Sequence, residues 1–194
     1  MAKTFPWPKA GDSSEDVTYA AVGFALSNWE GLEAELCALY GAFHGWQPAE
    51  KRTIEGYSKG RRIFVDRLAA VRQASEMWFR QYCHQANEGK FTELMHETEE
   101  LSKVRNRIAH AIVLPYSIGD VLPGSTRVGN AGYTYCLVPA YYDSREQEFF
   151  SEDYMDFKPV YALVSSDIRA LGYEFNRLRM NIFNFRQPIN LIHI

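Results

Sequence analysis

A single apolar face that extends over about six helical turns constrains the fold of this chain more than any other feature. Between residues 17 and 43, apolar residues recur at steps of three and four positions, which is the period of an amphipathic helix. Ser13, Ser14 and Asp16 are candidate N-caps for that helix. Such a long face needs other helices to cover it, so the sequence predicts a helical bundle. The apolar positions are Val22, Leu26, Trp29, Leu32, Leu36, Leu39 and Phe43.

Two further helices are expected between residues 48 and 89. Pro48 suits the first turn of a short helix that reaches about Tyr57. The break at Lys59-Gly60 precedes a longer helix, and Asn87-Glu88-Gly89 is expected to close it. Both segments supply apolar faces to the same bundle.

The fourth helix is expected from about Thr92 to Ile112, and Pro115 is expected to stop it because proline removes a helical hydrogen bond. A last helix is expected to start at Ser165 or Ser166, either of which is a suitable cap. Its apolar positions again recur at helical steps.

Between residues 115 and 165 the pattern changes to glycine and proline turns and two runs of β-forming residues, 133–138 and 160–164. These runs predict a small antiparallel hairpin or sheet. The predicted fold class is therefore mainly α: a bundle of four or five helices, with a small antiparallel β insertion before the last helix. Residues 1–15 are expected to form a flexible leader, and residues 1–194 one domain.

Composition narrows the class of protein. The chain has 46% hydrophobic and 23% charged residues, as ordinary soluble globular proteins do. A net charge of −3 excludes a uniformly basic nucleic-acid binder, so any RNA contact has to be concentrated in one place. There is no signal-peptide pattern and no bilayer-spanning run, and the three scattered cysteines do not suit a disulfide framework. We therefore expect a cytoplasmic protein without a membrane partner.

The segment Arg105-Asn106-Arg107-Ile108-Ala109-His110 carries the chemistry, near the end of the fourth helix. Arginine binds phosphate through a planar fork, and histidine moves protons near neutral pH. At about 100° per residue, Asn106 and His110 lie about 40° apart, whereas Arg105 lies on a flank about 140° from His110. The polar stripe faces away from the apolar positions, so one copy makes a poor cleft. If two such helices meet about a two-fold axis, Arg105 of one chain can approach His110 of the other.

The pattern Arg105-Asn106-(three residues)-His110 resembles the Arg-x4-6-His motif of the HEPN superfamily of ribonucleases. The stretch Trp29-Glu30-Gly31-Leu32-Glu33 and the final amphipathic helix are also similar to bacterial HEPN proteins. The resemblance covers about residues 17–112 and 166–186, and the β segment looks like a subfamily insertion. It implies an all-α bundle that forms a homodimer through the motif helices, with a metal-independent endoribonuclease site at their junction.

The resemblance implies catalytic roles for Arg105, Asn106 and His110. His110 would act as general acid or base, Arg105 would bind the non-bridging phosphate oxygens, and Asn106 would orient the histidine or the substrate. Lys103 and Arg107 flank the motif and are predicted to bind the RNA backbone. The sequence has no zinc-binding spacing, so no metal and no cofactor are expected.

HEPN proteins are common in toxin–antitoxin, antiphage and stress systems, so the resemblance also implies RNA as substrate and an antitoxin or other regulatory protein as partner. One departure weakens the antitoxin assignment. A toxin subgroup has tyrosine two residues after the histidine, where this chain has Ile112. Pairing with the nucleotidyltransferase antitoxin of that subgroup is accordingly less expected.

Besides an active endoribonuclease, two other classes of function stay open from the sequence. One is a catalytically inactive HEPN-like module that binds RNA or a protein, and the other is a purely structural helical dimer. Replacing His110 by alanine separates the first two, because only an enzyme would lose cleavage. Replacing Arg105 would leave RNA affinity unchanged in a purely structural dimer.

Overall fold

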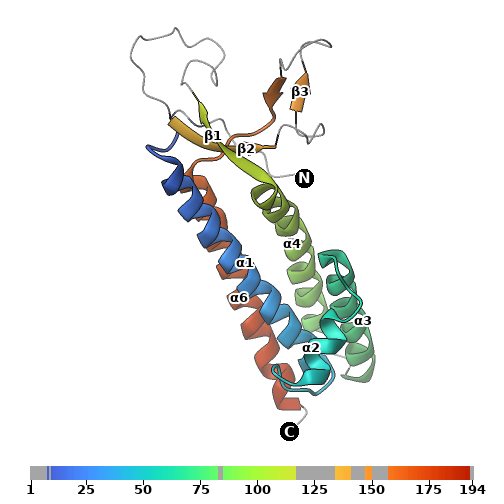
Figure 1. The fold of residues 1–194 in the computed structure, drawn as a ribbon. Coiled ribbons are helices and arrows are strands. Elements are labelled where there is room, and N and C mark those ends of the chain that lie inside the picture. Colours follow the sequence, from blue (N-terminus) through green and yellow to red (C-terminus); the bar gives the residue numbers. More distant parts are fainter. Residues whose placement is uncertain are drawn as a thin grey trace, which may run out of the picture. The chain divides into compact units, whose positions relative to one another are not determined.

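The computed structural model describes residue 8 and residues 10–82, 85–116, 134–140, 147–149 and 157–192. These residues form five helices, α1 (Glu15–Phe43), α2 (Lys51–Ser58), α3 (Phe64–Tyr82), α4 (Gln85–Ala109) and α6 (Ser165–Ile192). They also form four strands, β1 (Ala111–Tyr116), β2 (Thr134–Pro139), β3 (Gln147–Phe149) and β4 (Phe157–Pro159) (Figure 1). The predicted class, mainly helical with a small antiparallel sheet before the last helix, is confirmed.

The chain forms two compact units, and α1, α4 and α6 each contribute residues to both. The first unit comprises residues 1–27 and 103–173, and the second comprises residues 28–102 and 174–194. Each unit has its own buried apolar side chains. In the described part of the chain, none of the helices combines the length and the apolarity that a membrane crossing requires. One domain over residues 1–194 stays a prediction.

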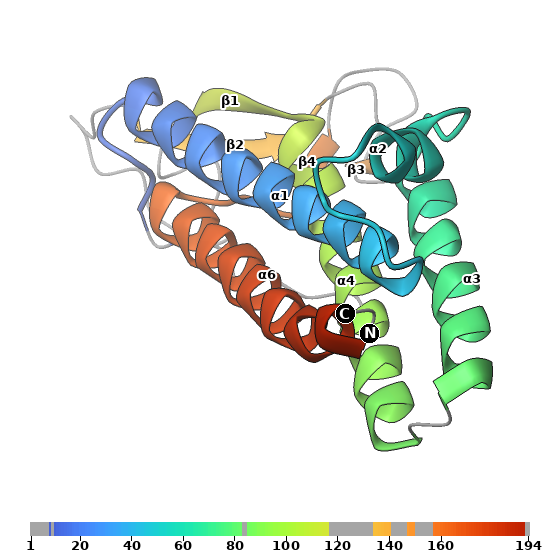
Figure 2. The same cartoon turned by 90° about the horizontal axis from the view of Figure 1, so that it is seen from below.

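The second unit is a helical bundle around the apolar face that the sequence predicts on α1 (Figure 2). Trp29 is fully buried, and its ring meets Phe64 of α3 and Phe175 of α6 edge-to-face, with centroids 5.0 and 5.3 Å apart. Further along α1, Phe43 meets Phe91 of α4 in the same way, at 5.5 Å. Aromatic pairs in this geometry stabilise a core beyond their buried area, which is why these helices pack on that face.

The first unit contains the two-stranded antiparallel sheet of β1 and β2, in a register that runs from Ala111 opposite Pro139 to Tyr116 opposite Thr134. A small apolar cluster lies on the sheet, with Cys136, Val138 and Ala162 buried and Ile112 and Val164 packed against them. The other edge of β2 makes two isolated bridges, from Tyr135 to Asp12 and from Leu137 to Leu163. Strands β3 and β4 pair with each other as a second antiparallel ribbon.

The start of the fourth helix differs from the prediction. Asn87-Glu88-Gly89 does not close α3, which ends at Tyr82; it lies inside α4, which already begins at Gln85. Gly89 is exposed, and a β-carbon there would meet nothing within 4 Å. A glycine at such a site costs a helix about 1 kcal/mol. Burial of Phe91, Leu94 and Met95 over the next two turns outweighs that cost.

The end of the fourth helix also differs from the prediction. Helix α4 ends at Ala109, and Ile112 lies in β1 rather than in the helix. Isoleucine, valine and tyrosine favour strands, and the pairing with β2 supplies the hydrogen bonds that a longer helix would have made. Pro115 lies within β1 instead of stopping a helix. It faces Tyr135, whose backbone N–H and C=O bond to Asp12, so no proline N–H is needed there.

The β insertion is confirmed in part. The run 133–138 corresponds to β2, but its partner is β1 and not the run 160–164, in which Leu163 alone makes a bridge to β2. Residues 117–133, 141–146 and 150–156 of the predicted insertion lie outside the described residues, as do residues 1–7 and 9 of the predicted leader. Helix α2 begins at Lys51, not at Pro48, because the Glu50 carboxylate accepts the Gln47 N–H at 2.7 Å and holds a turn before the helix.

Candidate functional site

The motif predicted from the sequence lies in the first unit, in the last helical turns of α4. Residues 103–109 are helical, and His110 is the first residue after the helix. Its backbone N–H donates to the Asn106 carbonyl at 3.0 Å, so helical hydrogen bonding reaches His110. The angles of an ideal helix therefore apply to all of these residues.

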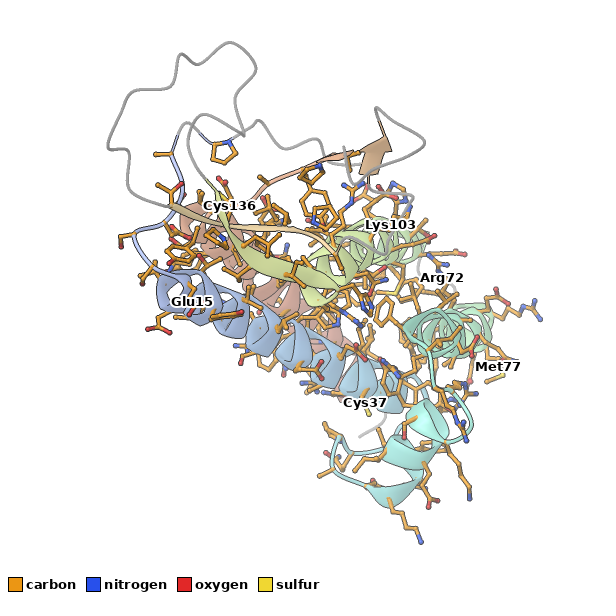
Figure 3. All side chains as sticks on the ribbon, turned by 45° about the horizontal axis from the view of Figure 1, so that its top comes forward. Glu15, Cys37, Arg72, Met77, Lys103 and Cys136 are labelled. Carbon is orange, nitrogen blue, oxygen red and sulfur yellow. The ribbon has the colours of Figure 1, made fainter. Side chains whose placement is uncertain are left out.

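Three of the predicted residues share one exposed face. Lys103, Asn106 and His110 are all exposed, and they span about 60° around the helix axis. Val104 and Ile108 of the same turns are buried. Figure 3 marks Lys103 on α4. The structure thus leaves an ammonium, a carboxamide and an imidazole open to solvent on one face, and each of these groups can donate a hydrogen bond to a phosphate oxygen.

Arg105 has a different environment from the other motif residues. It lies about 140° from His110 but only about 60° from the buried Ile108. The residue is half-buried, and its Nε atom is buried. Within one chain, Arg105 therefore lies toward the apolar side of its helix and not beside His110.

Arg107 lies nearer to the histidine, about 60° away around the helix. It is half-buried, and its guanidinium carbon lies 5.4 Å from the centre of the Tyr161 ring. The Tyr161 hydroxyl donates to the Arg107 backbone carbonyl at 3.1 Å. One tyrosine therefore contacts both the backbone and the side chain of a motif residue. Sequence reasoning missed it, because Tyr161 sits in a run whose only signal is β propensity.

The Asp12 carboxylate organises the unit that carries the motif. It accepts hydrogen bonds from the Thr18 hydroxyl at 2.7 Å, the Ser165 hydroxyl at 2.6 Å and the Ser165 backbone N–H at 2.8 Å. The Asp12 backbone bridges Tyr135 of β2 at 2.8 and 3.0 Å. One side chain thus joins the start of α1 to the start of α6, beside β2. The sequence prediction gave Ser165 a capping role, whereas its hydroxyl bonds to Asp12.

Cysteine chemistry finds no support at the sheet. Cys136 is buried on β2, and burial, together with the Asp12 and Asp167 carboxylates, raises the pKa of its thiol to about 11. Because the thiolate is the nucleophilic form, burial and this raised pKa disfavour reaction of Cys136 at neutral pH. The described residues also contain no group of three or more His, Cys, Asp or Glu side chains that could hold a metal ion.

Comparison of the chain with protein-family models, with curated proteins and with solved structures gives no match. The resemblance to HEPN proteins therefore rests on the motif and helix pattern of this chain alone.

Proposed function

We propose that the protein is a metal-independent endoribonuclease of HEPN type, which acts as a homodimer through the C-terminal end of α4. The observation that supports this proposal is the exposed face of Lys103, Asn106 and His110. An imidazole and an ammonium on one face, both open to solvent, suit a substrate that is a polyanion and needs proton transfer.

The reaction uses the 2′-hydroxyl that lies beside each phosphate in RNA. His110 removes the hydroxyl proton, the 2′-oxygen attacks phosphorus, and the bond from phosphorus to the 5′-oxygen breaks. The leaving 5′-oxygen then takes this proton back from the imidazolium of the same His110. The products are a 2′,3′-cyclic phosphate and a 5′-hydroxyl. General acid and base steps of this kind are worth about 10²–10⁴-fold in rate. DNA lacks the nucleophile and is not cut.

The position of Arg105 is the reason for proposing a dimer. In one chain, Arg105 lies about 140° from His110, too far around the helix to bind the same phosphate. Two α4 helices related by a two-fold axis present Arg105 of one chain to His110 of the other. Arg105 then stabilises the charge on the non-bridging oxygens, and Asn106 orients the imidazole or the substrate.

The first test is cleavage of mixed RNA by the purified protein in excess EDTA. His110→Ala should abolish cleavage, and His96→Ala is the matched control because His96 is an exposed histidine on the same helix. The parent and His96→Ala should cut RNA to fragments with cyclic phosphate ends. Cleavage that persists in His110→Ala, or cleavage that EDTA stops, would contradict the proposal.

The composite site has its own test. Arg105→Ala and His110→Ala should each be inactive, but mixed dimers retain one intact site. If the two variants exchange subunits freely, half of the dimers are mixed and each has one of two sites, so about a quarter of the parent activity returns. A site confined to one chain predicts no recovery on mixing.

The second candidate function is an inactive HEPN-like module that binds RNA or a protein partner. The half-burial of Arg105, with its Nε atom enclosed, favours it, because a buried guanidinium is also what a structural role requires. For such a module, His110→Ala would leave RNA binding intact, and the parent would not cut RNA.

A further inference from the structure

The end of α4 creates a backbone group that needs a donor from elsewhere in the chain. In an α-helix the carbonyl of residue i accepts the N–H of residue i+4, and the last four carbonyls have no such partner. For Arg107 that residue is Ala111, which already belongs to β1. The Tyr161 hydroxyl takes this place and donates to the Arg107 carbonyl at 3.1 Å. The bond fixes the turn from which His110 projects.

The ring of Tyr161 is itself held firmly. The residue is only 5% exposed, and the backbone of Leu163, two residues on, pairs with Leu137 of β2 at 2.8 and 2.9 Å. Between them, Ala162 is buried in the cluster on the sheet. Tyr161 is therefore anchored to β2 and presents a rigid ring to α4.

The Arg107 guanidinium lies over this ring, with its central carbon 5.4 Å from the ring centre. An arginine stacked on an aromatic face loses little hydrogen-bonding capacity, because its N–H donors lie in the guanidinium plane. A supported side chain also loses less rotamer freedom when it binds an anion. These are the properties of a cation prepared to bind a phosphate.

We infer that Tyr161 is a positioning residue that holds Arg107 beside His110 to bind an RNA backbone phosphate. The inference rests on the proposed function, to which it adds a residue that acts through another. Arg107 lies about 60° from His110 on the helix, so it serves the histidine of its own chain. Arg105 is left for the neighbouring chain of the dimer.

The experiment measures binding of a labelled single-stranded RNA in a His110→Ala background, so that cleavage cannot interfere. Tyr161→Leu removes the ring and should weaken binding about two- to fivefold, the usual worth of a cation–π contact at a partly exposed site. The slope of log affinity against log salt should fall by about 0.7, the contribution of one phosphate contact to a single strand. Tyr161→Phe keeps the ring beneath Arg107 and loses only the hydroxyl bond to the Arg107 carbonyl, so it should retain the parent's slope and most of its affinity.

Coupling to Arg107 separates positioning from general damage. The double variant Tyr161→Leu with Arg107→Gln should bind no more weakly than Arg107→Gln alone. Phe24→Leu is the matched control, because it removes the ring beneath Arg169, whose guanidinium carbon lies 5.9 Å away, and it should not change RNA affinity. If Tyr161→Leu does not fold, Arg107→Lys decides the question: it keeps the charge but not the planar stack, and should still weaken binding.

The inference would be overturned if the losses of RNA affinity from Tyr161→Leu and Arg107→Gln added up in the double variant. It would also be overturned if Tyr161→Leu bound RNA with the parent's affinity. Where Tyr161→Leu does not fold, the parent's affinity in Arg107→Lys would overturn it. A parent that binds RNA through a coupled Tyr161–Arg107 pair but does not cut it would overturn the proposed function alone. A parent that cuts RNA with no such coupling would overturn the inference alone. A parent that does not bind RNA would contradict both.

Discussion

Replacement of Asp12 by alanine should lower the free energy of unfolding of the protein. The variant loses three hydrogen bonds to a carboxylate, from the Thr18 hydroxyl and from the hydroxyl and N–H of Ser165. These bonds span up to 153 residues of sequence, so they fix segments that no local contact joins.

The size of the effect follows from the exposure of the three donors. Thr18 is fully buried, so its hydroxyl loses its acceptor without gaining water, at a cost of about 1–3 kcal/mol. Ser165 is half-exposed, and water replaces much of what it loses, which leaves about 1 kcal/mol. Together these give about 2–4 kcal/mol of unfolding free energy. For a chain of 194 residues, a loss of about 3 kcal/mol lowers Tm by roughly 6–12 °C.

Urea unfolding, followed by circular dichroism, measures the loss. Asp12→Asn should fall between the parent and Asp12→Ala, because its amide retains one acceptor oxygen. Glu30→Ala, at an exposed position on α1, is the control and should change stability by less than about 0.5 kcal/mol. If Asp12→Ala matches Glu30→Ala, the three hydrogen bonds make no net contribution and the reasoning fails.

Three further predictions concern other described residues. Cys136, with its pKa raised to about 11, should resist iodoacetamide at about pH 8 until the protein unfolds. Peptide mapping after pulsed labelling measures this, and rapid labelling of the folded protein would contradict the burial of the thiol. Gly172→Ala should lower the free energy of unfolding by about 1–3 kcal/mol, because its β-carbon would lie 2.7 Å from the Phe24 ring. Gly23→Ala, whose β-carbon would meet nothing within 4 Å, should raise it by up to about 1 kcal/mol in the same urea unfolding assay. Arg67→Ala removes the ion-pair partner of Glu33, whose side chain is largely buried, and should lower the free energy of unfolding by about 3–5 kcal/mol. Arg72→Ala breaks the exposed ion pair with Glu99 and should lower it by less than about 1 kcal/mol. Similar urea midpoints for the two variants would refute the distinction.

The long helices could be predicted because their signal is local. The apolar face of α1 has the helical period over its whole length, and the observed helix, Glu15–Phe43, agrees with it. The break expected at Asn87-Glu88-Gly89 was wrong for the opposite reason. Turn-forming residues are a weak local signal, and burial of the residues that follow them, Phe91, Leu94 and Met95, decides that this helix continues.

The switch from α4 to β1 could not be predicted from local pattern. Ile112 continues the apolar stripe of the fourth helix, yet it also fits a strand, since its side chain is β-branched. The pairing of Ile112 with Val138, 26 residues later on β2, decides that this segment is a strand. A single sequence does not reveal which segments pair, so the helix was extended three residues too far.

At the candidate site, too, the local spacing could be predicted from the sequence and the non-local contacts could not. The spacing of Asn106 and His110 follows from helix geometry, and the structure leaves both exposed on one face, as the spacing requires. The frame around them is non-local: Tyr161 reaches Arg107 across 54 residues, and Asp12 reaches Ser165 across 153. Spacing within a helix therefore identifies the residues that carry chemistry, whereas the residues that hold them in place come from distant strands and turns. The candidate site has to hold the flexible side chain of Arg107 beside His110, so these distant residues decide how well the two groups are placed. Substitution of Tyr161 tests that placement without changing the motif itself.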